Sequence, residues 1–264
     1  MSKNVTTFEV CMEIKVLSKI KAKELKGLST KKERDRRRLF LAEGDKCVKD
    51  MLDAFVPEFL ICNRDWLSNN PFIEDTFNKQ LYLADNKTIG LISSLSSLPD
   101  VIGVFRMPVE DNEIPVLDKN RLYLLLDEVQ DPGNLGTIIR TCDWFGVYDI
   151  YASKNTVDAY GPKVVQSTMG SLSRVRVRYV DLEKLILKNR EIKLIGTLLD
   201  GEPFNQIKLE AKGMLLMGNE GRGISDSLKS YIDLPLTIPP SNKNSHPDSL
   251  NVAIATAVIL SHIS

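Results

Sequence analysis

The feature that most constrains the fold lies in the second half of the chain, where short, nearly continuous apolar runs alternate with helix-like stretches. Runs this apolar are typical of strands buried on both faces of a sheet, and their alternation with helices indicates parallel strands. Residues 121–264 therefore predict an α/β domain with a parallel sheet. The expected strands are LYLLLDEV (122–129), YDIYAS (148–153), RVRVRYV (174–180), KLIGTLL (193–199), GMLLMG (213–218) and DLPLTIP (233–239). Helices are expected at 134–145, 163–172, 182–189, 225–232 and 250–263.

The first half, residues 1–108, predicts a second and smaller α/β domain. A basic helical stretch over 15–38 leads into RRRLFLAEGDKCVKDMLDAF, whose apolar residues can supply core contacts. Shorter runs follow, with PEFLICN, KQLYLAD and VIGVFRMP strand-like and PFIEDTF and NKTIGLISSL helix-like. The polar, proline-containing segment VEDNEIPVLDKN (109–120) predicts a linker between the two domains.

Composition excludes several classes of protein. Apolar residues make up 43% and charged residues 27% of the chain, as in ordinary globular proteins. No apolar run reaches the roughly 18 residues that cross a bilayer, so no membrane partner is expected. The first residues lack a signal-peptide pattern, and we expect a cytoplasmic protein. Four scattered cysteines (Cys11, Cys47, Cys62 and Cys142) predict buried, reduced thiols, with neither a metal site nor a disulfide framework.

Charge is distributed unevenly, although the formal net charge is zero. Between Lys15 and Arg38 there are eleven Lys and Arg residues against three acids, a local excess of eight that the rest of the chain balances. Two interpretations stay open at this point. The stretch forms an electropositive contact surface, or it is a solvated helix face.

The stretch DPGNLGTIIRTCDWF places polar groups at the carboxyl end of a strand, where ligands bind in open parallel sheets. Leu135, Ile138, Ile139 and Cys142 follow helical spacing and should face the sheet. Asn134 occupies the expected helix N-cap, and Arg140 lies on the opposite face, so both are candidate site residues or simply a cap and a surface cation. GNLG lacks the third glycine and the later acid of a dinucleotide-binding fingerprint, which argues against that class.

Two later stretches add polar groups at the ends of apolar strands. LLMGNEGRGIS (215–225) sets Asn219, Glu220 and Arg222 among glycines; a plain tight turn explains the glycines but not Glu220. After a polar loop, SLNVAIATAVIL (249–260) begins a helix that is apolar nearly all round. Ser249 could be its cap, and Asn251 in the first turn is a poor helix former, which hints at another use.

Together these three motifs, in this order and at these separations, resemble the SpoU-type RNA ribose 2′-O-methyltransferases of the knotted SPOUT superfamily. The N-terminal stretch SKIKAKELKGLSTKKERDRRRLFLAEGDKCVKDML resembles the substrate-binding domain of many members, a fold akin to ribosomal protein L30. One departure is visible. The loop Pro239–Ser249 is longer than usual and has no glycine, which puts cofactor contacts mapped onto it in doubt.

The resemblance implies S-adenosylmethionine as methyl donor, bound at a deep trefoil knot, and a homodimer formed through the C-terminal domain. The cofactor positions it implies are Thr197, Leu198, Gly218, Asn219, Glu220, Gly221, Ile238, Ser249 and Leu250. The apolar last helix would suit the dimer interface.

The resemblance also implies a catalytic group, comprising Asn134, Arg140, Glu220, Ser249 and Asn251. A guanidinium with a pKa above about 12 is a poor base. We therefore expect Arg140 to clamp an RNA phosphate and stabilise alkoxide charge, with Glu220 orienting the arginine. The other three would fix the site.

RNA is the expected partner of residues 1–108, because the acceptor is a ribose 2′-hydroxyl. The phosphate contacts expected there are Lys31, Lys32, Arg34, Arg36, Arg37 and Arg38. Ribosomal RNA is the expected substrate. Transfer RNA and a catalytically inactive RNA-binding protein of the same fold are the alternatives.

Overall fold

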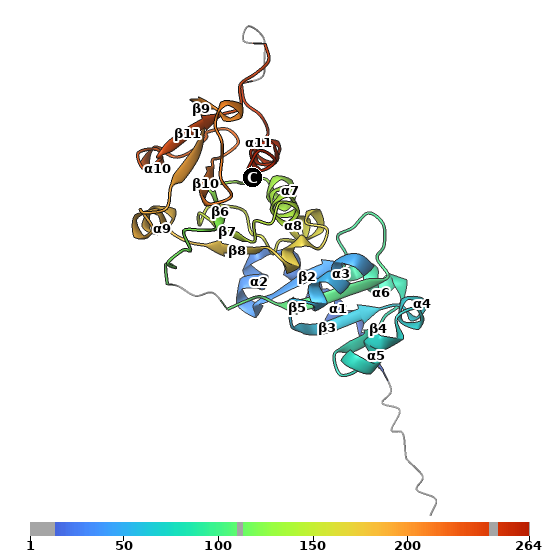
Figure 1. Ribbon diagram of the computed structural model, residues 1–264. Coiled ribbons are helices and arrows are strands. Elements are labelled where there is room, and N and C mark those ends of the chain that lie inside the picture. Colours follow the sequence, from blue (N-terminus) through green and yellow to red (C-terminus); the bar gives the residue numbers. More distant parts are fainter. Residues whose placement is uncertain (1–13, 110–112, 243–247, 264) are drawn as a thin grey trace, which may run out of the picture.

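The structure is a computed structural model that describes residues 14–109, 113–242 and 248–263. Figure 1 shows two units, each built around its own sheet, with the N-terminal half in blue to green and the C-terminal half in green to red. The α/β class expected for both halves is confirmed. Cys11 lies outside the described residues.

The N-terminal unit is a five-stranded mixed sheet in the order β1-β4-β3-β5-β2. Its strands are β1 (Lys15–Val16), β2 (Leu39–Glu43), β3 (Pro57–Cys62), β4 (Leu81–Leu83) and β5 (Val101–Arg106). Its helices are α1 (Lys19–Lys26), α2 (Lys31–Arg37), α3 (Asp45–Leu52), α4 (Arg64–Ser68), α5 (Pro71–Phe77) and α6 (Asn86–Ile92), with a 3₁₀ turn at Gly27–Ser29. Helices α1 and α6 supply the core on one face of the sheet, and α3, α4 and α5 supply it on the other. The helical stretch expected over 15–38 is wrong in part, because it is divided into β1, α1, the 3₁₀ turn and α2. Neither β1 nor β2 was predicted as a strand.

The C-terminal unit is a six-stranded sheet in the order β11-β9-β10-β6-β7-β8, and every neighbouring pair is parallel. Its strands are β6 (Leu122–Leu126), β7 (Asp149–Ala152), β8 (Arg176–Tyr179), β9 (Leu194–Pro203), β10 (Gly213–Met217) and β11 (Leu234–Thr237). Its helices are α7 (Pro132–Trp144), α8 (Pro162–Ser167), α9 (Leu182–Lys188), α10 (Asp226–Lys229) and α11 (Val252–Leu260), with 3₁₀ turns at Ser171–Ser173 and Phe204–Gln206. The six strands and five helices expected from the apolar pattern are all present.

Helices cover both faces of this parallel sheet, as buried parallel strands require. Residues of α7, α8 and α11 pack on one face, together with alternate strand residues such as Leu124 and Leu215. Residues of α9 and α10 pack on the other face, against Leu125 and Leu216. The carboxyl ends of the strands meet at one edge, which the loops leading into α7, α10 and α11 border.

Strand β9 is interrupted beside β11. Consecutive residues Pro235 and Leu236 of β11 pair with Gly196 and Glu202 of β9, so residues 197–201 are pushed out of the ladder. A Cβ at Gly201 would lie 2.5 Å from the carbonyl carbon of Leu236, so only glycine allows this approach. The deep knot implied by the resemblance remains a prediction.

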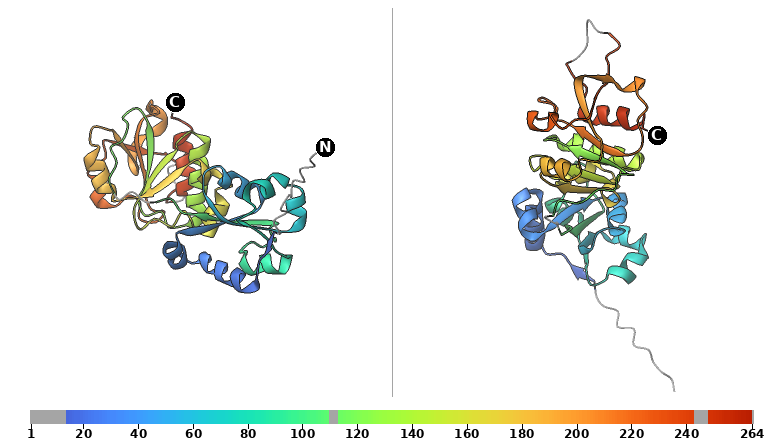
Figure 2. Two further views of the ribbon diagram at one scale, coloured as in Figure 1. Left: turned by 90° about the horizontal axis from the view of Figure 1, so that it is seen from below. Right: turned by 60° about the vertical axis from the view of Figure 1, so that its left-hand side comes forward.

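The two units share one hydrophobic core. Helix α8 packs against β2, and the rings of Phe40 and Tyr160 lie 5.0 Å apart at the junction. One continuous cluster of buried residues spans both units, from α3 to the α7 face of the C-terminal sheet, while the opposite face of each sheet has a cluster of its own. Figure 2 shows the two units in contact along this junction. The two domains therefore behave as one packed body.

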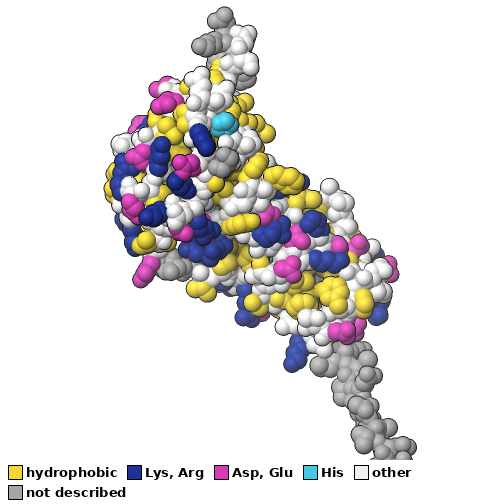
Figure 3. All heavy atoms as spheres, viewed as in Figure 1, with side chains coloured by type: hydrophobic (Ala, Val, Ile, Leu, Met, Phe, Trp, Pro, Cys, Tyr) yellow, Lys and Arg dark blue, Asp and Glu magenta, His cyan; other side chains and the backbone are white. Residues whose placement is uncertain are grey.

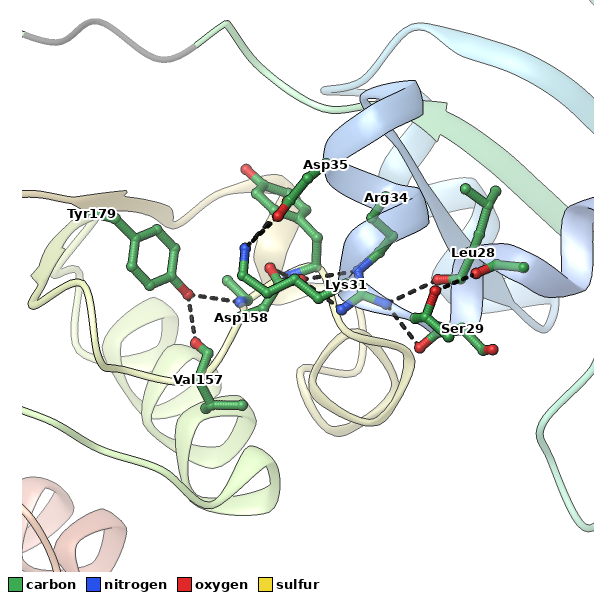
Figure 4. Close-up of polar contacts among 12 residues, drawn as sticks. Leu28, Ser29, Lys31, Arg34, Asp35, Val157, Asp158 and Tyr179 are labelled. Carbon is green, nitrogen blue, oxygen red and sulfur yellow. Dashed lines mark hydrogen bonds and ion pairs between the residues drawn. The ribbon is translucent and has the colours of Figure 1, made fainter.

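A buried ion pair joins the same two units. The Nη2 atom of Arg34 lies 2.6 Å from Oδ2 of Asp158, and the two side chains are 5% and 9% exposed. Arg34 also donates to the carbonyl oxygens of Leu28 and Ser29, and Tyr179 binds the backbone on either side of Asp158 (Figure 4). The expectation that Arg34 contacts RNA phosphate is therefore wrong. Its guanidinium instead pairs with the carboxylate of Asp158, 124 residues away in the sequence.

Part of the segment expected to be a linker is fixed to the C-terminal unit. The buried side chain of Asn189 accepts from the backbone N–H of Leu117 and donates to the carbonyl of Pro115. Leu117 itself is buried in the core beside α9. Among the described helices, none is long and apolar enough to cross a bilayer.

Candidate active site

Helix α7 begins at Pro132, two residues before Asn134. Asp131 is the N-cap, its carboxylate accepts from the backbone N–H of Asn134 at 2.8 Å, and Pro132 occupies the first helical position. The expected cap at Asn134 is thus wrong, because an acid placed just before a proline caps the helix instead. Leu135, Ile138, Ile139 and Cys142 are fully buried against the sheet, as their spacing predicts.

A hydrogen-bonded chain joins three of the expected catalytic residues. The Nδ2 atom of Asn134 donates to Oε1 of Glu220 at 2.9 Å, and Nδ2 of Asn251 donates to Oδ1 of Asn134 at 2.8 Å. The Oδ1 atom of Asn251 in turn accepts from the N–H groups of Ala253 and Ile254, so Asn251 is the N-cap of α11. Segments 86 and 117 residues apart are brought together at the carboxyl edge of the sheet.

The turn that carries Glu220 is shaped by Asn219 and glycines. The Oδ1 atom of Asn219 accepts from the N–H groups of Gly221 and Arg222, and its backbone pairs with Gly223 in an isolated bridge. Gly223 has φ +69°, which glycine adopts freely. A Cβ at Gly218 would lie 2.3 Å from backbone atoms of Gly223 and Ile224. These glycines are required for the close approach that presents Glu220 to Asn134.

Arg140 and Ser249 stay outside this chain of hydrogen bonds. Arg140 is exposed on the outer face of α7, and within residues 14–109, 113–242 and 248–263 its guanidinium has neither a hydrogen bond nor an ion pair. The expected contact between Glu220 and Arg140 is therefore not found, because Glu220 binds Asn134. Ser249 is exposed just before α11.

The expected cofactor positions lie at the ends of neighbouring strands. Thr197 and Leu198 belong to the residues pushed out of β9, Gly218 follows β10, and Ile238 follows β11. Leu250 precedes α11 and is 49% exposed. This set of positions holds one carboxylate and no cation, a chemistry that suits a cofactor bearing positive sulfonium and ammonium groups better than a phosphorylated one.

The expected RNA-contacting residues of α2 are partly occupied by local acids. Lys31 pairs with Asp35, and Arg36 and Arg37 both pair with Glu33. Arg38, just after the helix, donates to the carbonyl of Pro108. Lys31, Lys32 and Arg36 remain exposed. On the face that Figure 3 shows, positive and negative side chains are interspersed over both units.

Sequence reasoning did not find Glu128. This residue follows β6 with φ +57°, and its carboxylate accepts from Asn155 at 2.7 Å and from Arg222 at 2.9 Å. Its carbonyl accepts from Nδ2 of Asn219. A left-handed conformation at a residue other than glycine leaves no pattern in the sequence, so no local signal could have revealed it.

Of the three cysteines that the structure describes, Cys62 and Cys142 are buried as expected, whereas Cys47 is half-buried. Burial raises the pKa of Cys62 to about 12 and, as the largest cause, that of Cys47 to about 11. The pKa of Cys142 is raised further by the same cause. Among the described residues, no group of His, Cys, Asp and Glu could hold a metal ion.

Comparison with known families gives a match to each half of the chain. The model of the SpoU rRNA Methylase family matches residues 121–261, which include every residue of the hydrogen-bonded chain. The chain belongs to the SpoU rRNA methylase family. The MRM3-like substrate binding domain matches residues 19–96, within the N-terminal unit of this SpoU family member.

Individual relatives cover nearly the whole chain. The 23S rRNA (guanosine(2553)-2′-O)-methyltransferase RlmP of Bacillus subtilis is 33% identical over 92% of this chain and 95% of its own. A putative RNA methyltransferase of the TrmH family from Porphyromonas gingivalis has a structure that is 34% identical, with a TM-score of 0.81 over 94% and 98% of the two chains. The AdoMet-bound rRNA methyltransferase of Sinorhizobium meliloti is 30% identical, with a TM-score of 0.80 over 91% and 92%. The similarity to these relatives thus extends over both units.

Proposed function

We propose that this protein transfers the methyl group of S-adenosylmethionine to a ribose 2′-hydroxyl of structured ribosomal RNA. The observation that carries the proposal is the hydrogen-bonded chain Glu220–Asn134–Asn251 at the carboxyl edge of the sheet, in a member of the SpoU family. The names of relatives that span nearly the whole chain, such as the Bacillus subtilis 23S rRNA enzyme, support this reaction and substrate. A cytoplasmic location follows from such a substrate.

Each residue has a distinct part in the proposed reaction. Bound S-adenosylmethionine supplies an electrophilic methyl group on its sulfonium. The residues that would hold it are the nine cofactor positions named from the resemblance, and Glu220 supplies their negative charge. The acceptor hydroxyl must be held in line and lose its proton as attack proceeds. Arg140, exposed and without an acidic partner among the described residues, is free to clamp an RNA phosphate and stabilise alkoxide charge.

The N-terminal domain, predicted as residues 1–108, serves as the RNA-binding domain. Phosphate contacts come from the exposed groups Lys31, Lys32 and Arg36, with Arg37 and Arg38 beside them. Their pairing with Glu33 and Asp35 is between exposed or half-exposed groups, so it is weak and gives way to phosphate. Replacing Lys31, Lys32 and Arg36 with Gln should lower the slope of log K against log salt by up to about 0.9 for each phosphate that is no longer neutralised.

A homodimer formed through the C-terminal domain completes the proposal. Helix α11 buries Val252, Thr256 and Ile259 inside the chain but leaves Ile254 52% exposed. An apolar residue exposed on an otherwise buried helix suits a subunit interface. The dimer would be tested by sedimentation of wild type and Ile254→Glu, and a monomeric wild type would contradict it.

The central experiment is a ribose-methylation map of ribosomal and transfer RNA from cells with and without this protein. Loss of one 2′-O-methyl mark in ribosomal RNA, restored by purified protein and S-adenosylmethionine, is the expected result. Loss of a mark in transfer RNA alone would move the substrate to that class. Unchanged maps, with no cofactor uptake by calorimetry, would favour an inactive RNA-binding protein.

A further inference from the structure

We propose that Glu128 is a positioning residue for methyl transfer, which holds three loops at the carboxyl edge so that Glu220 meets Asn134. The inference rests on the proposed function and adds a residue outside the three motifs' polar set. Glu128 lies between β6 and α7, immediately after the buried Asp127 and three residues before the N-cap Asp131.

The contacts of Glu128 reach two other loops. Its backbone N–H donates to Oγ of Ser153 at 2.8 Å, and its Oε1 accepts from Nδ2 of Asn155 at 2.7 Å, both in the loop after β7. Its carbonyl accepts from Nδ2 of Asn219 at 2.7 Å, and its Oε2 lies 2.9 Å from Nη2 of Arg222, both in the turn after β10. One residue thus ties the β6, β7 and β10 loops together.

The contacts to the β10 turn connect Glu128 to the proposed catalytic group. The amide nitrogen of Asn219 donates to the backbone carbonyl of Glu128. This contact directs the amide oxygen of Asn219 to the N–H groups of Gly221 and Arg222. That arrangement sets the turn in which Glu220 lies. Glu220 then accepts from Asn134, whose own amide oxygen accepts from Asn251. A shift of about 1 Å in such a group can lower a rate on the order of a hundredfold.

Glu128 has a backbone conformation that is unfavourable for glutamate. With φ +57° the residue occupies the left-handed region, which glycine and asparagine adopt more readily. The left-handed backbone is therefore unfavourable for glutamate, whereas the two hydrogen bonds that its carboxylate accepts are favourable. The side chain is 26% exposed, so the pair with Arg222 is partly shielded from solvent.

This conformation allows the role of the side chain to be tested without straining the backbone. Glu128→Gly keeps the left-handed backbone without strain and removes the whole side chain, and with it the carboxylate contacts to Asn155 and Arg222, while the backbone contacts to Ser153 and Asn219 can remain. We expect the kcat for RNA methylation to fall about tenfold or more, with the KM for S-adenosylmethionine within about twofold, since orientation and not cofactor binding is lost. Arg222→Gln should lower kcat in the same direction. The double variant Glu128→Gly/Arg222→Gln should be less impaired than the product of the two single variants predicts.

The matched control is Met169→Gly, which also replaces a left-handed residue (φ +51°), here beyond the end of α8. It should leave kcat unchanged. A kcat for Glu128→Gly equal to that of Met169→Gly, with wild type active, would overturn the inference and leave the proposed function standing.

If wild type methylates no RNA, the proposed function fails and the inference is decided by a readout without turnover. The side-chain N–H NMR signals of Asn155 and Arg222, which lose their carboxylate partner, should then shift in Glu128→Gly and not in Met169→Gly. Unshifted signals would overturn the placement of Glu128 as the residue that holds these loops.

Discussion

At the scale of single residues, the orientation of the Asn134 side-chain amide determines the hydrogen bonds of the site. A carboxylate only accepts hydrogen bonds, so Glu220 fixes the NH₂ group of Asn134 toward itself. The oxygen of Asn134 must then face Asn251, which leaves the oxygen of Asn251 for the N–H groups at the start of α11. The orientation of three side chains thus follows from one charge.

Asn134→Asp tests this wiring without changing the size of the side chain. The variant sets a second carboxylate 2.9 Å from Glu220, where like charges repel and the pKa of the pair rises. We expect kcat at pH 8 to fall on the order of a hundredfold and to recover partly as the pH is lowered and the pair takes up a proton. A pH–rate profile checks this; Thr137→Val, on the exposed face of α7, is the control. A profile parallel to wild type would contradict the wiring.

Arg140→Lys tests the clamp assigned to the exposed arginine. Lysine keeps the charge but loses the two-pronged geometry that matches a phosphate. Turnover should nearly vanish, while the Kd for S-adenosylmethionine stays within about twofold, since only the RNA contact is altered. Single-turnover kinetics with calorimetry measures both. Unchanged turnover would rule the clamp out.

The buried thiols give a prediction about pH. Burial holds the pKa of Cys47 at about 11 and that of Cys62 at about 12, above the value of an exposed thiol. A group whose pKa is higher in the folded state stabilises the fold below its unfolded pKa and loses that contribution as pH rises through the folded value. The free energy of unfolding should therefore decline above about pH 9. Cys47→Ala/Cys62→Ala should flatten the decline measured by urea titration, and an equal slope would refute the assignment.

At the scale of elements, backbone approach limits what the strands tolerate. Gly201→Ala would place a methyl group 2.5 to 2.8 Å from three backbone atoms of Leu236, which cannot move aside as a flexible side chain could. We expect a loss of about 1–3 kcal/mol in unfolding free energy, measured by urea denaturation. Gly90→Ala in α6 is the control. Its new methyl would meet only Leu98 at 3.5 Å, so this change should be neutral or stabilising. Equal stabilities of the two variants would show that the strands can separate.

The elements themselves were largely predictable, and the exceptions have physical causes. Strands that are buried on both faces are almost wholly apolar, so all six strands of the C-terminal sheet could be recognised. Strand β2 was missed because it follows a run of arginines and only Gly44 separates it from α3, so its five residues looked like part of a helical stretch. The start of α7 was misplaced because two residues, Asp131 and Asn134, could each cap it.

The site was predictable in its members and not in its contacts. Asn134, Glu220 and Asn251 could be singled out because each is a polar residue in one of the three motifs, which the resemblance assigns to the catalytic group. That Glu220 would bind Asn134 and not Arg140 depends on the turn after β10, which Asn219 and Glu128 set. Contacts that depend on residues a hundred positions apart carry no local sequence signal.

At the scale of the whole molecule, the junction between the units is held by a pair of charges inside a common core. Burying two charges is costly, so such a pair contributes little net stability, but removing one partner leaves the other uncompensated. Arg34 and Asp158 therefore fix how the units dock more than how tightly they fold.

Arg34→Met should lower the free energy of unfolding by about 3–5 kcal/mol, because Asp158 is left buried and unpaired. Arg34→Met/Asp158→Leu should recover most of that loss while the KM for RNA stays raised, since the docking angle is no longer specified. Urea denaturation, RNA kinetics and spin-label distances between the units measure these effects. Arg36→Met, which removes an exposed pair, is the control. A double variant with wild-type distances and KM would show that the pair does not set the angle.

The shared core has a consequence for exchanging parts between relatives. Since Phe40 and Tyr160 interdigitate across the junction, a transplanted RNA-binding half would arrive with an unmatched contact face. A chimera should therefore be functional only if Arg34 and Phe40 are transferred together with their contact partners Asp158 and Tyr160. Changing the RNA target of such a hybrid then requires exchanging the residues of the junction as well as the RNA-binding half.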